Sequence, residues 1–179
     1  MNLGAIKIDD TKDFFKELIS IVLVALVMAM LLRTFIVEGR VIPSGSMLPT
    51  IQLQDRVMVN KFIYYFKKPQ RGDIIVFQPP LKSSEDYIKR LIGLPGDKVE
   101  VRDSIVFIND QPLNEPYINE PPNYNFGPTI VPQNSLFVMG DNRNSSFDSH
   151  LWNAWLTQDK VKGKAFFRYW PPSRMGVLK

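Results

Sequence analysis

The segment that most limits the fold is residues 18–32, fifteen consecutive residues without a charged side chain. A helix over this segment is about 22 Å long, against roughly 30 Å for the hydrocarbon core of a bilayer. Apolar residues continue it past Arg33, and Lys16 stands just before it. Both cations can direct their charges toward the lipid head groups, which extends the span to bilayer length. The sequence therefore predicts a transmembrane helix over residues 16–37.

Two alternatives compete with this anchor, a buried helix of a soluble protein and a cleavable secretory signal. The segment is apolar on every face, and no second helix is predicted that could cover it. Residues 27–29 have the small-residue character of a cleavage site, but the apolar run continues through residues 30–32. Three lysines precede the span and two arginines follow it, which weakly favours a cytoplasmic N-terminus. We predict an uncleaved anchor with residues 1–15 in the cytoplasm.

After the anchor the pattern changes to short apolar runs and alternation with a period of two, which is typical of strands. Gly, Asp, Asn and Pro separate the runs. Strands are predicted at residues 57–62, 74–77, 87–94, 99–101, 105–108, 136–139 and 165–169. Residues 112–132 hold six of the fourteen prolines and are predicted to be a long surface loop. The fold class is mainly β, with one mostly antiparallel domain over residues 38–179.

Composition excludes several classes of site. The chain has no cysteine and one histidine, so neither a thiolate site nor a histidine-rich metal site is available, and we expect no metal or other cofactor. The net charge is +4, without a dense basic run interleaved with aromatic residues. Nucleic acid is therefore not an expected partner, whereas a mildly basic surface suits anionic lipid.

Residues 41–50 are the first candidate site. Ser44 and Ser46 flank Gly45, and Pro43 and Pro49 restrict the backbone on either side. This pattern predicts a bent, rigid turn that holds two hydroxyl groups in defined directions. By itself the same sequence is also ordinary turn material.

Lys89 is the second candidate. In a strand over residues 87–94 it shares a face with Tyr87 and Leu91, while Arg90 points the opposite way. If both faces pack, desolvation lowers the pKa of Lys89, and a neutral amine can take a proton from a hydroxyl group. The alternative is an ordinary surface lysine.

Residues 140–150 are the third candidate, with two acids, three hydroxyls and the only histidine of the chain. Asp141, Arg143 and Asp148 can pair there and fix the backbone. Such polar density also occurs in solvated loops.

Together these stretches resemble the ordered sequence boxes of type I signal peptidases. The boxes are PSGSMLPT at 43–50, DRVMVNK at 55–61, KRLIGLPGD at 89–97 and GDNR at 140–143. The resemblance implies a membrane-anchored Ser–Lys endopeptidase that removes signal peptides from exported preproteins after small residues. It also implies an unusual, mostly antiparallel β catalytic domain on the outer face of the membrane. The single span and residues 147–150 are similar to the cyanobacterial and thylakoid branch, so the resemblance implies either a plasma membrane or a thylakoid membrane.

The resemblance also implies roles for individual residues. Ser46 matches the nucleophile and Lys89 the general base, while Ser44 and the backbone N–H of Ser46 match the oxyanion donors. Ser146 matches the hydroxyl that orients the lysine, and Asp148 matches a supporting acid. The residues that match the apolar substrate pockets are Ile42, Met47, Ile51, Tyr87 and Ile88. The chain departs from the commonest family pattern at Gln54, Asn144 and His150.

Three other readings use the same residues differently. Ser46, His150 and Asp148 could form a triad; the chain could be an inactive, membrane-anchored β adaptor that binds peptides; or it could be a self-cleaving Ser–Lys protein of the repressor-processing kind. The expected partners are the signal peptides of preproteins and membrane lipid, and we expect a monomer. The aromatic run at residues 62–66 could touch lipid, although a place in the core is the stronger expectation.

Overall fold

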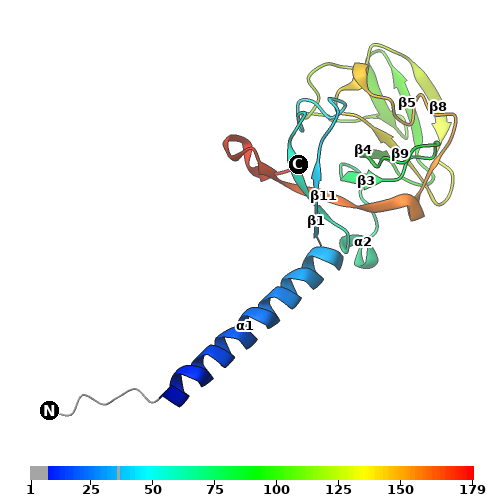
Figure 1. Ribbon diagram of the computed structural model, residues 1–179. Helices are drawn as coiled ribbons and strands as arrows, with labels where there is room; N and C mark the ends of the chain where they lie inside the picture. The colour runs from blue at the N-terminus through cyan, green and yellow to red at the C-terminus, as the bar shows by residue number, and fades with distance from the viewer. Residues whose placement is uncertain (1–7, 36) are drawn as a thin grey trace. The chain divides into compact units, whose positions relative to one another are not determined.

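The computed structural model describes residues 8–35 and 37–179, which divide into two compact units, residues 1–37 and 38–179 (Figure 1). The first contains helix α1 (Ile8–Phe35), whose side chains over residues 12–30 are exposed. Among the described residues, no helix is both long and apolar enough to cross a membrane. Of the predicted segments 1–15 and 16–37, residues 1–7 and 36 lie outside the described part.

The second unit is built from short strands, which confirms the mainly antiparallel β prediction. Its elements in chain order are β1 (Val37–Val41), β2 (Arg56–Asn60), α2 (Ile63–Phe66), β3 (Ile74–Phe77), β4 (Tyr87–Gly93), β5 (Lys98–Arg102), β6 (Ile105–Ile108), β7 (Gln111–Pro112), β8 (Phe126–Ile130), β9 (Ser135–Met139), β10 (Leu156–Thr157), β11 (Val161–Trp170) and β12 (Gly176–Val177). Short 3-10 turns lie at Arg143–Ser145, Gln158–Lys160 and Pro172–Arg174.

These described strands form two sheets. The larger has the order β1-β2-β11-β3-β4-β9-β10, with β12 paired to β11, and the smaller has the order β7-β6-β5-β8. The pairs β2–β11, β3–β11, β3–β4 and β4–β9 are antiparallel. Strands β3 and β4 are therefore interior strands, and Figure 1 shows them beside β9.

Strand β4 is buried because the larger sheet packs on both faces. Ile74, Val76 and Ile88 belong to the hydrophobic cluster that contains the 42–51 turn. The alternating residues Ile75 and Leu91 belong to a second cluster on the other face. Every residue of β4 after Tyr87 is consequently buried, including two cations. The condition set for Lys89 by the sequence, a strand packed on both faces, is met.

Several features differ from the sequence-based expectation. The short strands β7, β10 and β12 were not predicted, and β11 begins at Val161 rather than at residue 165. Three further differences have a local cause. The proline-rich segment 112–132 contains strand β8, which pairs with β5 although Pro128 lies within it. Strand β1 was not predicted, because its sequence, VEGRV, carries two charges and a glycine. Strand β2 ends at Asn60 rather than at residue 62, since the Asn60 side chain accepts the backbone N–H groups of Phe62 and Ile63 and turns the chain into α2.

The aromatic run at residues 62–66 is mostly outside the core, so the stronger expectation for it was wrong. Phe62, Tyr65 and Phe66 are exposed, and their rings contact one another. Only Tyr64 packs inward, where its hydroxyl donates to Asp73 over 3.0 Å. A one-turn helix fixes one inward position and leaves its neighbours facing solvent, a pattern that differs from strand alternation.

Residues 113–125, here called the strap, lie against the loop that follows β9. Glu115 accepts two hydrogen bonds of 2.6 Å from Arg143, and Asn123 donates its backbone N–H to Asn144 over 2.9 Å. Farther along, the Tyr124 ring stacks on His150. The strap thus fastens the polar segment 140–150 from one side.

Candidate active site

The turn after β1 brings the two serines to the edge of the larger sheet. Its backbone is closed by hydrogen bonds from Leu48 N–H to Gly45 O and from Ile51 N–H to Met47 O. Met47 and Ile51 are fully buried beneath it. Two buried apolar anchors thus hold the turn down and leave the preceding serines at the cavity.

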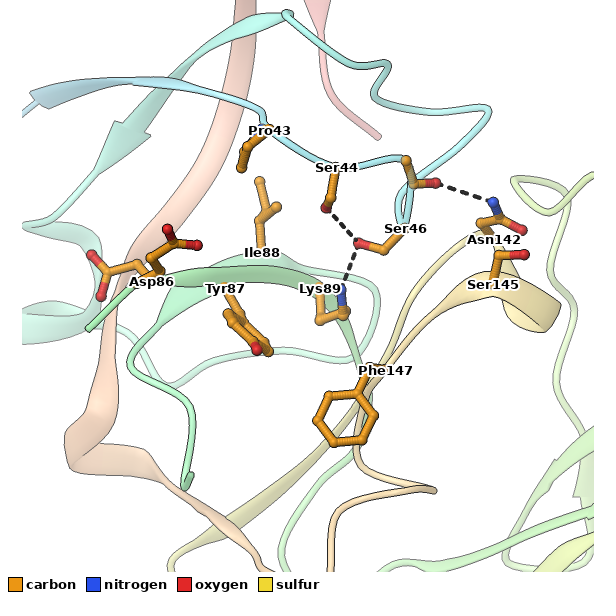
Figure 2. Close-up of a pocket in the computed structure, with 12 residues that line it drawn as sticks. Pro43, Ser44, Ser46, Asp86, Tyr87, Ile88, Lys89, Asn142, Ser145 and Phe147 are labelled. Carbon is orange, nitrogen blue, oxygen red and sulfur yellow. Dashed lines mark hydrogen bonds between the residues drawn. The ribbon is translucent and has the colours of Figure 1, made fainter. Parts of the chain in front are cut away.

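Ser46 and Lys89 meet in a buried contact. The Lys89 Nζ donates a hydrogen bond of 2.6 Å to the Ser46 Oγ, and only 8% of Ser46 and 4% of Lys89 are exposed. Figure 2 shows this bond, with the Ser44 hydroxyl 3.4 Å from the Ser46 Oγ on the other side. The arrangement brings a hydroxyl group and an amine within proton-transfer distance of each other.

Burial lowers the pKa of Lys89 from 10.5 to about 8, against the opposing effect of the nearby Asp148 and Asp141 carboxylates. An amine with a pKa of about 8 is neutral in about a tenth of the molecules at pH 7, compared with well under 0.1% for an ordinary lysine. The side chain is therefore a usable base near neutral pH.

The turn also offers donors for a developing negative charge. The Ser46 backbone N–H donates to no acceptor within the described residues. Ser44 lines the same cavity. A free N–H and a hydroxyl beside the Ser46 Oγ are groups of the kind that can stabilise an oxyanion.

The loop after β9 is tied to this turn by its backbone. Asn142 donates its N–H to the Ser46 carbonyl and its side-chain amide to the Gly45 carbonyl, each over 3.1 Å. Gly140 packs so closely that a Cβ there would lie 2.3 Å from the Ser146 Oγ and 2.4 Å from the Ser46 carbonyl oxygen. Ser146 is thereby placed against the turn. Its hydroxyl is buried and makes no hydrogen bond to Lys89 or to any other described residue.

Asp148 lies beneath this loop and is fully buried. Its Oδ2 accepts the Gly140 N–H over 2.8 Å, and its Oδ1 lies 2.7 Å from the Nδ1 of His150. Among the described residues, no hydrogen bond joins His150 to Ser46. The Ser46 hydroxyl accepts a hydrogen bond from Lys89 instead. The contacts favour a Ser–Lys pair over a triad through His150.

A buried ion pair supports the site from behind. Arg90 donates to both oxygens of Asp141 over 2.8 and 2.7 Å, and Thr50 donates to the same carboxylate over 2.5 Å. Arg90 adjoins Lys89 on β4, and Thr50 ends the serine turn. The pair therefore connects the three sequence segments that carry the candidate residues.

Two adjoining cavities lie along β4, and Ser46 lines the larger of them. The larger, about 450 Å³, is lined by Pro43, Ser44, Gly45, Ser46, Glu85, Asp86, Tyr87, Ile88, Lys89, Asn142, Ser145 and Phe147. The second, about 320 Å³, continues past Ile88 to Ile42, Val76 and Arg40. Of the predicted pocket residues, Ile42, Tyr87 and Ile88 line these cavities, whereas Met47 and Ile51 lie in the core behind them.

The edge of β4 facing the cavity is open. Tyr87, Ile88 and Lys89 pair with β3 on one side, but β9 pairs with β4 only from Arg90 onward. The opposite wall is the extended segment around Pro43 and Ser44. A peptide strand can enter between them by adding to the sheet edge.

Some residues of the cavity were not singled out by the sequence. Phe147 is half exposed and lies on the far side of Lys89 from Asp86 (Figure 2). Asn142 fixes the turn through hydrogen bonds that span 97 positions in the sequence. Among the described residues no cluster of His, Asp or Glu could hold a metal ion.

Comparison with known proteins links this geometry to a family. A family model described as signal peptidase, peptidase S26, matches residues 15–170. The chain is 51% identical over 173 residues to a probable signal peptidase I-1 of Synechocystis sp., covering 93% of this chain and 88% of the relative. It is 49% identical over 161 residues to a signal peptidase I of Leptolyngbya laminosa, covering 86% and 79%. Thylakoidal processing peptidase 1 of Arabidopsis thaliana is 42% identical over 161 residues, which are 84% of this chain and 47% of the relative.

Proposed function

Because the chain belongs to the signal peptidases of family S26, we propose that Ser46 is the nucleophile and Lys89 the general base of its reaction. The protein is a serine peptidase that removes signal peptides from preproteins. The observation that carries the assignment of residues is the buried bond of 2.6 Å between the Lys89 Nζ and the Ser46 Oγ.

The cycle begins with neutral Lys89. Its amine takes the proton of Ser46 as the Oγ forms a bond to the scissile carbonyl carbon, and the carbonyl oxygen becomes an oxyanion. The Ser46 N–H and the Ser44 hydroxyl stabilise that charge. The C–N bond then breaks as Lys89 donates its proton to the leaving amine. Water attacks the acyl-enzyme in the same way and restores Ser46.

The cavities suggest how the substrate is selected. A chain lying along the open edge of β4 directs alternate side chains toward the sheet. The apolar walls at Ile88 and Ile42 suit small apolar side chains just before the cut. Since Lys89 must reach the leaving amine, the residues after the cut lie toward Phe147.

Cleavage of a test preprotein by the purified full chain in detergent tests the assignment. The wild type is expected to release the signal peptide at one bond, identified from the product masses. Ser46→Ala and Lys89→Ala should leave no measurable cleavage, whereas Lys160→Ala, at an exposed lysine in the turn before β11, serves as a matched lysine control. Substantial turnover by Lys89→Ala would sink the assignment of the base.

We further propose that residues 16–37 anchor the chain in a membrane and that residues 38–179 work on its outer or lumenal face. The charge-free run at 18–32 and its exposed apolar side chains support this proposal. The full chain should remain in the membrane pellet after an alkaline carbonate wash. Replacing Val22 and Leu26 by Asp should release it, and extraction of the wild type by carbonate would contradict the anchor.

A further inference from the structure

The side chain of His150 lies beneath the active-site loop and does not touch Ser46. It is 9% exposed and contacts Asp148 through its Nδ1. Its ring stacks on Tyr124 with a centroid distance of 4.2 Å and an interplanar angle of 5°, and meets the edge of Phe126 at 6.4 Å. The strap and β8 therefore hold the imidazole in one orientation against a fully buried carboxylate.

Asp148 connects His150 to Ser46 and Lys89 through its contact with Gly140 and through its charge. The carboxylate oxygen that does not face His150 accepts the Gly140 N–H, and Gly140 packs against both the Ser146 hydroxyl and the Ser46 carbonyl. The charge of Asp148 also acts on the base, because it raises the pKa of Lys89 against the effect of burial.

We propose that His150 is a positioning residue for the general base: it holds Asp148 beneath the Gly140–Ser146 contact, and its charge sets the net charge of the pair that faces Lys89. A neutral imidazole leaves the pair with one negative charge, which favours the ammonium form of Lys89. A protonated imidazole makes the pair neutral and favours the free amine. The inference rests on the proposed role of Lys89.

Few other groups can supply this charge. Burial raises the pKa of Tyr124 far above its usual range, so its phenol stays neutral. The next charges near the strap, Arg143 and Glu115, are paired with each other. Asp141 is paired with Arg90. In the described part of this region, the side chain at position 150 is thus the one that contacts Asp148 directly, and a substitution there changes the charge of the pair.

The test measures kcat/KM against pH for three forms of the full chain in detergent. His150→Gln keeps a neutral hydrogen-bonding side chain at every pH, and His150→Arg supplies a fixed positive charge that can also stack on Tyr124. The rising limb should have its midpoint about one pH unit lower in His150→Arg than in His150→Gln.

A further variant guards against a folding defect in His150→Arg. Asp148→Asn removes the negative charge and should lower the midpoint in the same direction, while thermal unfolding reports whether each variant is folded. Coincident midpoints for the folded Gln and Arg variants would overturn the proposal. If Arg does not fold, an Asp148→Asn midpoint equal to that of the Gln variant overturns it. A wild type with no rising limb at all would instead contradict Lys89 as the base.

Discussion

At the scale of the residue, the chemistry depends on burying one amine without pairing it to a carboxylate. Lys89 and Arg90 are adjacent and both buried, but their surroundings differ. Arg90 meets Asp141 in a two-pronged ion pair, whereas Lys89 meets the uncharged Ser46 hydroxyl. A guanidinium stays charged when buried, while an unpaired amine is free to lose its proton. The sheet thus makes a structural cation and a base from neighbouring positions.

The pH dependence follows from this burial. Lys89 must be neutral to act, so kcat/KM should rise with pH through a midpoint near 8, the lowered pKa of its amine. A series of initial rates from pH 6 to 9.5 on one preprotein checks the midpoint. A profile that stays flat over this interval would show that another group accepts the proton.

Ser44→Ala removes one candidate oxyanion donor and leaves the Ser46–Lys89 contact in place. An oxyanion donor is typically worth about 3 kcal/mol, so kcat should fall by on the order of 10²-fold with little change in KM. Ser44→Thr, which keeps the hydroxyl, is the matched control and should recover most of the rate. Equal losses in Thr and Ala would show that the hydroxyl is not the cause.

At the scale of the element, the site is held by loops fastened to one another rather than by a single strand. Asn142 bonds to the carbonyls of Gly45 and Ser46, and the strap holds Arg143, Asn144 and His150 from outside. Loops are usually the mobile parts of a domain, and these contacts restrict that mobility. Residues 140–148 therefore position Ser146 and Asp148 as firmly as a strand would.

Gly140→Ala tests how close this packing is. A Cβ at Gly140 has no room beside the Ser46 carbonyl, so the loop or the serine turn must shift. A shift of about 1 Å at a reacting group can cost on the order of 10²-fold in rate, and we expect at least that loss of kcat. Gly176→Ala, at a glycine with open space around it, is the control. Wild-type rates for Gly140→Ala would show that the loop can move without consequence.

At the scale of the whole molecule, the exposed aromatic turn of the second unit follows Lys61, which contacts Glu38, the first residue after the predicted anchor. Glu38 follows the last residue of α1 by three positions, and its carboxylate lies 3.7 Å from the Lys61 Nζ, next to Phe62. If residues 16–37 are anchored as proposed, Glu38 leaves the membrane directly, and we expect the aromatic turn to contact lipid. Lys67 and Lys68 extend the aromatic residues with exposed cations.

Because the chain has no cysteine, single labels can test this contact. An environment-sensitive fluorophore on Tyr65→Cys should shift to the blue when the full chain is reconstituted in vesicles containing anionic lipid, and a lipid-borne quencher should reduce its emission. Ile130→Cys, an exposed position on β8, is the control and should stay unchanged. A solvent-like spectrum at residue 65 would contradict lipid contact.

The sequence predicted most of the core strands but not the segments whose contacts position the candidate site residues. Residues 74–77 are a continuous apolar run and residues 87–94 carry apolar side chains on both faces, so both segments were predicted as strands, and burial of Lys89 follows from packing on both faces. The strap and β8 were predicted as one surface loop because prolines are rare within strands. The pairing of β8 with β5 depends on tertiary contacts that a single sequence does not show. The roles of Asn142 and Tyr124 depend on partners far along the chain, at Gly45 and His150. No local pattern in a single sequence encodes such pairs.

The open edge of β4 limits which peptide bonds of a preprotein can be cleaved. The candidate cavity lies between Pro43 and the open edge of β4 at Ile88, and a peptide that adds to a sheet edge must be extended rather than helical. A signal peptide must therefore unwind near its end before Ser46 can reach it. A folded mature domain is spared even where its sequence offers a suitable small residue. The enzyme thus selects its substrates first by the conformation of their backbone and only then by their side chains.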